Sequence, residues 1–374
     1  MRFMFACGGT AGHINPAIAV AKAFLQKDPA CEILFIGSDG LEADLVPREG
    51  FRLEKLKVSG FQRKFTPKAI WENLCTAKDL MGSLKKAKKI LKDFRPDAVI
   101  GTGGYASFPA LRQGAKLGIA TFVHESNAVP GLTTRMVADS VRCIMVSFEA
   151  CRENYHDPEK VVVTGTPCRE EFLYLEKKTA REKLGLDDKP LIVSCWGSLG
   201  AREMNKKIAD FMVREDAEGK FRHIHATGSY GWKWMPELVQ KLGVSLQDHP
   251  LIDLREYLYD MPTAMAAADL MICRAGAATI SEITVSGTPA IIVPSPNVTD
   301  NHQEKNARVL EKAGAAVVFR EEECSGESLY AAAKELLQDP EKLSSMRKAL
   351  AELSVVDATE RICKTVLETL KAQS

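Results

Sequence analysis

The sequence predicts an α/β protein with two Rossmann-like domains, each a doubly wound parallel sheet, that face a central cleft. Two observations predict this fold. Short apolar runs alternate with helix-length segments along the whole chain, as parallel sheets covered by helices on both faces require. The runs form two series of about six, and a length of 374 residues suits two domains. Ligands of such a protein are expected at the carboxyl ends of the strands.

The elements follow from these runs in chain order. In the first half we expect strands over Phe3–Cys7, Glu32–Ile36, Ala98–Gly101, Ala120–His124, Cys143–Ser147 and Val161–Thr164. In the second half we expect them over Leu191–Cys195, His223–Ala226, Leu251–Leu254, Leu270–Cys273, Ala290–Val293 and Ala316–Phe319. Helices are expected from near Pro16, from near Phe108, over 340–352 and over Asp357–Leu370. The predicted division is residues 1–164, residues 165–356 and a terminal helix in 357–374.

Composition limits the kind of partner and the compartment. The net charge is only +1, which gives no argument for nucleic acid as a partner. The ten cysteines are scattered, several in apolar runs, and no C-x-x-C pair occurs. That pattern favours a reducing compartment over a disulfide scaffold. The chain opens on a strand-like run without a signal peptide, and no apolar stretch approaches a membrane span. We therefore expect a cytoplasmic protein, soluble or peripheral to a membrane.

Three glycine-rich loops each follow a predicted strand. They are Gly8–His13, Gly101–Ser107 and Gly197–Ala201. Small residues at a strand-to-helix turn let backbone N–H groups approach an anion, so each loop is either a phosphate site or a plain turn. His13 is either a capping and packing residue or a general base that the positive helix end keeps neutral.

A fourth segment, Arg274–Glu282, again leads small residues into a helix. Ala277, Ala278 and Thr279 can offer N–H groups to a diphosphate there. Glu282 either accepts hydrogen bonds from ribose hydroxyls or only stabilises the helix dipole. The polar segment Asp300–Gln303 downstream is well placed for sugar hydroxyls.

No metal site is predicted. His223 and His225 alternate on one strand, but no third ligand is evident, and no Asp-x-Asp motif occurs. A basic segment, Lys78–Arg95, carries seven Lys and Arg against Asp79 and Asp93, and apolar Phe61, Phe65, Ile70, Trp71 and Leu74 precede it. It is either a contact with an anionic lipid surface or an ordinary solvated helix face.

Together these motifs resemble the MurG-type peptidoglycan N-acetylglucosaminyltransferases over nearly the whole chain. The resemblance rests on Gly8–Pro16, Gly103–Pro109, His124–Gly131, Gly197–Ala201, Arg274–Glu282, Asp300–Ala307 and Asp357–Arg361. It implies the GT-B fold, with an acceptor-side and membrane-facing first domain, a UDP-sugar-binding second domain and a last helix that packs back on the first. The sequence departs from the family pattern at Ala11, Ser126, Trp196 and Leu199.

The resemblance also implies an inverting transfer of N-acetylglucosamine from UDP-N-acetylglucosamine to undecaprenyl-diphosphate-N-acetylmuramoyl-pentapeptide. It implies this activity at the cytoplasmic face of the plasma membrane, where the enzyme is peripheral, with no tightly bound cofactor. His13 is the candidate base. The implied acceptor-diphosphate loops contain Gly9, Thr10, Gly103, Gly104 and Tyr105. The implied donor-binding residues are Thr10, Ala11, Gly12, Asn127, Arg169, Ser198, Leu258, Ala277, Ala278, Thr279, Ile280, Ser281, Glu282 and Gln303.

Three other functions compete with this one. A related GT-B enzyme would glycosylate another lipid, such as diacylglycerol. A nucleotide-sugar-binding module would have no activity, which His13, Asn127 and Glu282 together disfavour. A nicotinamide-dependent oxidoreductase is disfavoured because the G-x-G-x-x-G turn with a later acidic residue is missing.

Overall fold

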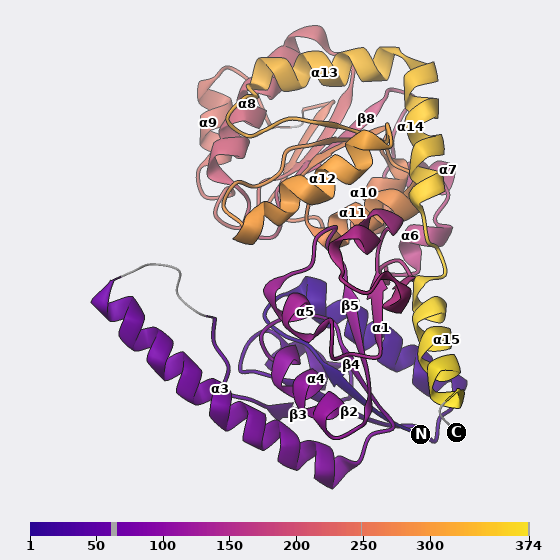
Figure 1. Ribbon diagram of the computed structural model, residues 1–374. Helices are drawn as coiled ribbons and strands as arrows, with labels where there is room; N and C mark the ends of the chain where they lie inside the picture. The colour runs from indigo at the N-terminus through magenta and orange to yellow at the C-terminus, as the bar shows by residue number, and fades with distance from the viewer. Residues whose placement is uncertain (61–65, 248, 373–374) are drawn as a thin grey trace. The chain divides into compact units, whose positions relative to one another are not determined.

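The chain folds into two compact units in a computed structural model (Figure 1). The structure describes residues 1–60, 66–247 and 249–372, and for residues 67, 69 and 70 it describes the backbone alone. One unit comprises Met1–Cys168 with Val355–Ser374, and the other comprises Arg169–Ser354. The sequence instead suggests boundaries after residues 164 and 356. The last helix thus shares a unit with the N-terminal sheet.

The first unit contains a parallel sheet of seven strands in the order β3-β2-β1-β4-β5-β6-β7. The strands are β1 (Arg2–Ala6), β2 (Glu32–Gly37), β3 (Arg52–Lys55), β4 (Ala98–Gly101), β5 (Ala120–Glu125), β6 (Cys143–Val146) and β7 (Val161–Val163). The helices are α1 (Ala11–Lys27), α2 (Glu42–Arg48), α3 (Pro67–Phe94), α4 (Ser107–Lys116), α5 (Leu132–Val137), the short η1 (Glu149–Asn154) and η2 (Pro158–Lys160), and α15 (Ala358–Lys371).

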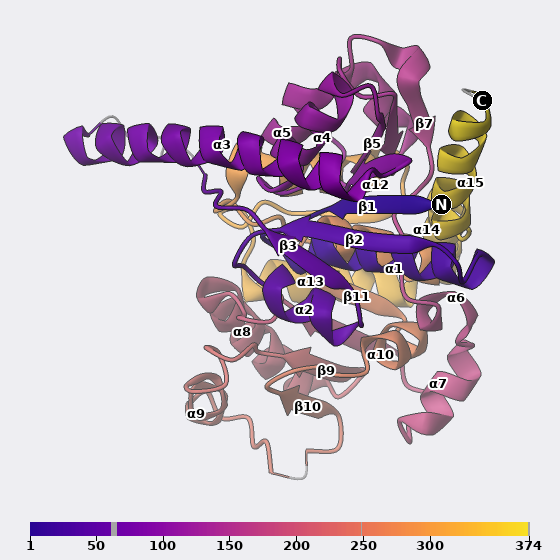
Figure 2. The ribbon, with the colours of Figure 1, turned by 90° about the horizontal axis from the view of Figure 1, so that it is seen from below.

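Buried aromatic residues of β1 and β2 hold helices α1 and α15 against one face of this sheet. The ring of Phe3 stacks on that of Phe24 in α1 with centroids 4.0 Å apart. Ile362, Cys363 and Val366 of α15 belong to the same buried cluster, so the end of the chain completes the core of the N-terminal sheet. Helices α3 and α4 pack against each other, as do α4 and α5 (Figure 2).

Two sequence-based expectations for this unit are wrong. Strand β3 was not expected, because its sequence Arg-Leu-Glu-Lys has no apolar run and it lies at the exposed edge of the sheet. Helix α1 begins at Ala11 and not near Pro16, which lies inside it. Pro16 is the sixth residue of the helix, where it removes one intrahelical hydrogen bond, and so it does not mark the start of the helix.

The second unit contains a parallel sheet of six strands in the order β10-β9-β8-β11-β12-β13. The strands are β8 (Leu191–Cys195), β9 (Arg222–Ala226), β10 (Ile252–Arg255), β11 (Leu270–Cys273), β12 (Ala290–Ile292) and β13 (Ala316–Val318). The helices are α6 (Glu171–Tyr174), α7 (Lys177–Lys183), α8 (Arg202–Glu218), α9 (Met235–Lys241), α10 (Met261–Ala267), α11 (Ala277–Ser286), η3 (Thr299–Asn301), α12 (His302–Lys312), α13 (Gly326–Gln338) and α14 (Pro340–Leu353).

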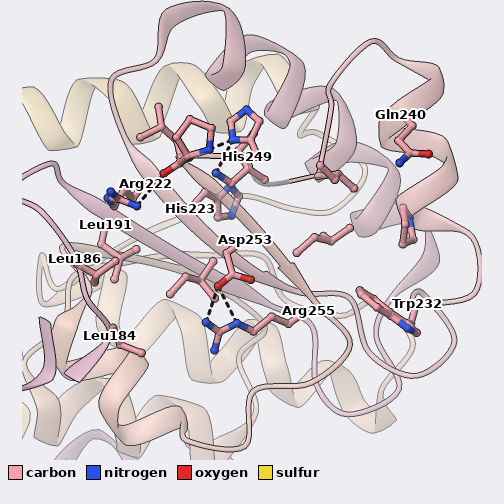
Figure 3. A pocket seen from close by; sticks show the side chains of 17 residues that line it. Leu184, Leu186, Leu191, Arg222, His223, Trp232, Gln240, His249, Asp253 and Arg255 are labelled. Carbon is pink, nitrogen blue, oxygen red and sulfur yellow. Dashed lines mark hydrogen bonds and ion pairs between the residues drawn. The ribbon is translucent and has the colours of Figure 1, made fainter. Parts of the chain in front are cut away.

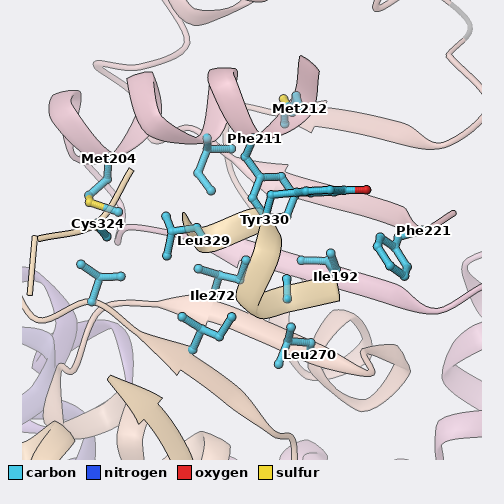
Figure 4. Packing of buried hydrophobic residues seen from close by; sticks show 14 of the residues in the cluster. Ile192, Met204, Phe211, Met212, Phe221, Leu270, Ile272, Cys324, Leu329 and Tyr330 are labelled. Carbon is cyan, nitrogen blue, oxygen red and sulfur yellow. The ribbon is translucent and has the colours of Figure 1, made fainter. Parts of the chain in front are cut away.

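The core of the second unit lies between this sheet and helices α8 and α13 (Figure 4). Phe211 of α8 meets Tyr330 of α13 edge to face, with ring centroids 5.2 Å apart. Ile192, Leu270 and Ile272 complete the contact from the strands. The prediction of two α/β domains with parallel sheets is therefore confirmed.

Strand order places the predicted loops. In each sheet the order reverses beside the first strand of the unit, between β1 and β4 and between β8 and β11. The carboxyl ends of strands at such a reversal form the usual ligand crevice of an open α/β sheet. The four loops singled out in the sequence follow these four strands: 7–13, 102–107, 196–201 and 274–279.

Candidate functional site

The first glycine loop joins β1 to α1. Thr10 is the N-cap residue with extended backbone, and Ala11 is the first helical residue. Within this loop Gly9 alone has a positive φ, of +85°, and the φ of Ala11 is not positive. The alanine is thus compatible with the loop's backbone, since the position that favours glycine is Gly9. The N–H groups of Ala11 and Gly12 lie in the first turn, where helices leave such groups unpaired.

His13 lies in that first turn with a defined tautomer. Its Nδ1 is 3.1 Å from the carbonyl oxygen of Gly8, which can only accept a hydrogen bond. Nδ1 therefore carries the hydrogen, and Nε2 of the neutral ring holds a lone pair. The backbone carbonyl of His13 also accepts from the Thr102 hydroxyl at 2.6 Å, which ties the turn to the second loop.

The second glycine loop lies directly against the first. A methyl group added at Gly104 would be 2.2 Å from the carbonyl oxygen of Gly8, and one at Gly103 would be 2.6 Å from the His13 ring. Both glycines also have positive φ, so no side chain fits there. Tyr105, about half exposed, lies with its ring over Gly60. The structure thus brings together the predicted residues of loops 8–13 and 101–107.

Sequence reasoning missed a buried carboxylate beneath the first loop. Glu42 of α2 is fully buried and accepts hydrogen bonds from Gly9 N at 3.0 Å, Ser38 N at 2.8 Å and Ser38 Oγ at 2.5 Å. Burial raises its pKa, but the hydrogen bonds from Ser38, Gly9 and its own backbone outweigh that and leave the pKa below its usual value. Glu42 therefore acts as an anionic anchor for the loop.

A second carboxylate plays the same part near Asn127. Glu125, at the end of β5, accepts from the side chain of Asn127 at 2.9 Å, from Gly131 N at 3.0 Å and from the Thr134 hydroxyl at 2.6 Å. The side chain of Asn127 is thereby held in one orientation. An acidic residue ending an apolar strand was the only signal in the sequence. Ser126 is buried and its carbonyl accepts from Ser147 at 3.0 Å.

In the second unit, the third loop presents an exposed serine. Gly197 and Gly200 have φ of +85° and +80°, and between them Ser198 and Leu199 are exposed. Trp196, by contrast, is buried, and the guanidinium of Arg274 lies 5.6 Å from its ring centroid. The tryptophan therefore supports the Arg274 segment while the serine faces solvent at the start of α8.

Helix α11 begins where the fourth motif predicted. Gly276 is its N-cap residue and Ala277, Ala278 and Thr279 form the first turn. Ile280 is buried, and the Ser281 hydroxyl donates to the Ala277 carbonyl at 3.1 Å, so these two side chains support the helix rather than face a ligand.

Glu282, one turn in, is a carboxyl that is hard to ionise. Burial raises its pKa to about 7, an effect that the charge of Arg169 opposes. A cation or a hydroxyl donor that reached this carboxyl would lower that pKa. Arg169 itself is exposed, with its guanidinium 5.0 Å from the ring centroid of Phe172.

Two further predicted residues lie on loops of the second unit. The side-chain oxygen of Gln303 accepts from Ser295 N at 2.9 Å, which leaves its NH₂ group as a donor. Leu258 is buried after β10, so only its backbone can contact a ligand by hydrogen bonding. Arg274 pairs with Glu321 at 2.5 Å and donates to the carbonyls of Val293 and Pro294, each at 3.0 Å.

A hollow of about 490 Å³ in the second unit lies elsewhere (Figure 3). Among its lining residues, Asp253 pairs with Arg255, Arg222 pairs with Asp187, and none of the predicted site residues is present. Within the described part of the chain, no group of three or more His, Cys, Asp or Glu residues is placed to hold a metal ion. The same residues include no helix with the length and apolarity of a membrane span.

The comparisons with known proteins cover nearly the whole chain. Residues 3–146 match the glycosyltransferase family 28 N-terminal domain, and residues 191–362 match the glycosyltransferase family 28 C-terminal domain. A protein of Acetivibrio thermocellus is 43% identical over 99% of this chain and 99% of its own length. It is a UDP-N-acetylglucosamine–N-acetylmuramyl-(pentapeptide) pyrophosphoryl-undecaprenol N-acetylglucosamine transferase, as is a protein of a Thermoanaerobacter species that is 44% identical over 98% of this chain and 99% of its own.

A solved structure agrees with this result. The crystal structure of MurG from Acinetobacter baumannii has a TM-score of 0.77 and 25% identity, over 98% of this chain and 99% of that one. The resemblance inferred from the motifs is thus confirmed, and with it the GT-B class of fold. The chain belongs to glycosyltransferase family 28, in the group of MurG-type N-acetylglucosaminyltransferases.

Proposed function

We propose that this chain transfers N-acetylglucosamine from UDP-N-acetylglucosamine to undecaprenyl-diphosphate-N-acetylmuramoyl-pentapeptide, the step from lipid I to lipid II in peptidoglycan synthesis. The observation that carries the proposal is the full-length similarity, at 43% and 44% identity, to enzymes named for this reaction. The loops at the two strand-order reversals supply chemistry that suits it.

The second unit is the proposed donor half. The first-turn N–H groups at Ala277, Ala278 and Thr279 and the exposed Ser198 suit the diphosphate of the donor. Glu282 would accept hydrogen bonds from the ribose hydroxyls, and the free NH₂ group of Gln303 would donate to the sugar. The backbone of Leu258 would contact the uracil.

The first unit is the proposed acceptor half. Gly9, Thr10, Gly103, Gly104 and Tyr105 form the proposed loops for the acceptor diphosphate, and the two glycines of the second loop bring it directly against the first. Ala11 and Gly12 complete the first loop, and the fixed side chain of Asn127 is a further donor contact.

His13 is the proposed general base. Nε2 takes the proton from the acceptor hydroxyl as its oxygen forms a bond to the anomeric carbon. The bond from that carbon to the diphosphate breaks, UDP leaves with the electron pair, and the configuration inverts. Arg169 and the N-terminus of α11 would stabilise the charge on the departing UDP, so the donor is a substrate and no tightly bound cofactor is needed.

Helix α3 is the proposed contact with an anionic membrane. Its positions 71, 74, 78, 81, 85, 89 and 92 recur every three or four residues and so share one face. Trp71, Leu74 and Met81 are 62–68% exposed on it, and lysines occupy the other positions. The opposite face buries Ser83, Ala87 and Leu91.

Exposed apolar residues beside cations suit the interface of anionic lipids. We place the protein at the cytoplasmic face of the plasma membrane, as a peripheral protein, on this ground. Phe61 and Phe65 lie outside the described residues, and so does the side chain of Ile70.

The decisive experiment compares acceptors. The protein is incubated with labelled UDP-N-acetylglucosamine and either the muramoyl-pentapeptide lipid or diacylglycerol in detergent, and the product is identified by mass spectrometry. We expect labelled product from the muramoyl lipid alone. Transfer to diacylglycerol would favour the related lipid glycosyltransferase, and donor binding without any transfer would favour a binding module.

A further inference from the structure

A chain of buried polar side chains crosses the core of the second unit. It runs from Glu215 of α8 through His223, Ser194 and His225 to Asn205 of α8, and each of these residues is fully buried. The contacts are 2.8 Å from Glu215 to His223, 2.7 Å from His223 to Ser194, 2.6 Å from Ser194 to His225 and 3.2 Å from His225 to Asn205. His223 lies beside the hollow of Figure 3, and Phe211, which contacts its ring edge to face, lies in the core of Figure 4.

The backbone carbonyl of Thr227 fixes the direction of the hydrogen bonds at its end of this chain. That carbonyl can only accept, so the Asn205 Nδ2 at 2.8 Å donates to it and Asn205 Oδ1 faces His225. His225 must then donate from Nε2. Burial, and then the charge of His223, lower the pKa of His225 well below its usual value, so its ring is neutral and Nδ1 accepts from Ser194.

The other end of the chain follows from the same rule. The Ser194 hydroxyl, having given its hydrogen to His225, accepts from His223 Nε2. A further proton lies between His223 Nδ1 and Glu215 Oε2, which are 2.8 Å apart and share it in a hydrogen bond. Each contact along the chain therefore holds one proton, and the chain ends on the Thr227 carbonyl.

The Thr227 carbonyl lies against the loop that presents Ser198. A methyl group added at Gly200 would be 2.0 Å from this oxygen, and one at Gly228 would be 2.1 Å from Gly200 N. Ser229 N donates to the Ser198 carbonyl at 3.1 Å, and Tyr230 N donates to that of Leu199 at 3.3 Å. The two loops pack backbone to backbone, so a shift of Thr227 displaces the Ser198 loop.

We propose that Glu215, His223, Ser194, His225 and Asn205 are positioning residues for the donor, which hold the Ser198 loop in place through the Thr227 carbonyl. This inference rests on the proposed function, in which Ser198 contacts the donor diphosphate. The Glu215–His223–Ser194 distances resemble those of a nucleophilic triad, but all three side chains are fully buried, so no substrate can reach the serine.

The test separates the donor from the acceptor. Ser194→Ala interrupts the chain at its middle, and Asn205→Ala removes its last member but leaves the rest intact. Both are expected to raise the KM for UDP-N-acetylglucosamine about tenfold, the equivalent of one lost hydrogen bond to a charged group, and to leave the KM for the lipid acceptor unchanged. Ser198→Ala, the direct contact, should give a similar donor-specific increase.

The control is Ile291→Val, a buried change in the same core on β12, where the register partners of Ile291 are Ile272 and Val317 and not members of the chain. It should lower Tm and leave both KM values unchanged. An unchanged donor KM in folded Asn205→Ala protein, beside a raised one in Ser198→Ala, would overturn the inference and leave the proposed function intact. An equal rise in the control would also overturn it. Wild-type protein that transfers no sugar would instead contradict the proposed function. If Ser194→Ala does not fold, Asn205→Ala alone decides the question.

Discussion

Replacing Glu42 tests how much its carboxylate contributes to holding the first glycine loop in place. In Glu42→Gln the side chain keeps its size, but one carboxylate oxygen becomes an NH₂ group. The remaining oxygen can still accept both bonds from Ser38, now without charge assistance. The NH₂ group then faces Gly9 N–H, which is a donor and loses its only partner on Glu42.

The structure sets the size of the effect. A hydrogen bond to a charged acceptor contributes about 1.5–3 kcal/mol and a neutral one about 1 kcal/mol. The two bonds from Ser38 each weaken by about 0.5–2 kcal/mol and the bond from Gly9 is lost, which together give a decrease of about 2.5–7 kcal/mol in the free energy of unfolding. The matched control is Glu32→Gln, whose exposed carboxylate pairs with Arg2 at 3.0 Å and should change stability by less than about 1 kcal/mol.

Urea unfolding at pH 7 measures both variants, and the transfer assay reports whether the loop still works. The pH dependence gives a second readout. Because the folded-state pKa of Glu42 lies below its ordinary value of 4.5, its stabilisation is present above pH 4.5 and is lost as the pH falls through the folded pKa. The gap between wild type and Glu42→Gln should therefore narrow in acid. A Glu42→Gln protein as stable and active as Glu32→Gln at pH 7 would refute the anchor.

Three further predictions concern the catalytic residue, the donor helix and the membrane face. His13→Ala should lower kcat by about 100- to 10,000-fold with little change in the KM for the donor, as removal of a general base does; kcat within a few-fold of wild type would exclude His13 as the base. Glu282 has a folded pKa of about 7 against an ordinary 4.5, so its favourable contribution to stability is complete below pH 4.5 and is lost as the pH rises through 7. Glu282→Gln should therefore match wild-type stability at pH 4.5 and exceed it by up to about 3 kcal/mol at pH 8. Equal pH profiles of the two proteins in thermal unfolding would contradict this. The double change Trp71→Asp and Leu74→Asp should abolish sedimentation with vesicles of anionic phospholipid but leave activity on detergent-dispersed acceptor intact. The control Glu32→Gln should sediment as wild type does. Unchanged sedimentation of the double variant would exclude this face of α3 as the membrane contact.

The loops could be found from the sequence because their signal is local. A parallel strand buried on both faces is an unbroken apolar run, and a strand-to-helix turn that brings its backbone to an anion is built from small residues. Both patterns lie within about ten residues of sequence, as at β8 and the Gly197–Ala201 loop. The polar edge strand β3 carries neither pattern, and it was missed.

The anchors of those loops could not be found, because their signal is distant in sequence. Glu42 lies 33 positions from Gly9, in a short helix whose acidic first turn is ordinary. His223 and His225 looked like half of a metal site, and only the fold brings Ser194, Glu215 and Asn205 to them. A buried carboxylate or imidazole is tolerated only where several donors or acceptors converge on it. In this chain such convergence occurs beneath Gly9, beside Asn127 and behind Ser198. The buried polar residues therefore hold in position the loops that carry the candidate site residues.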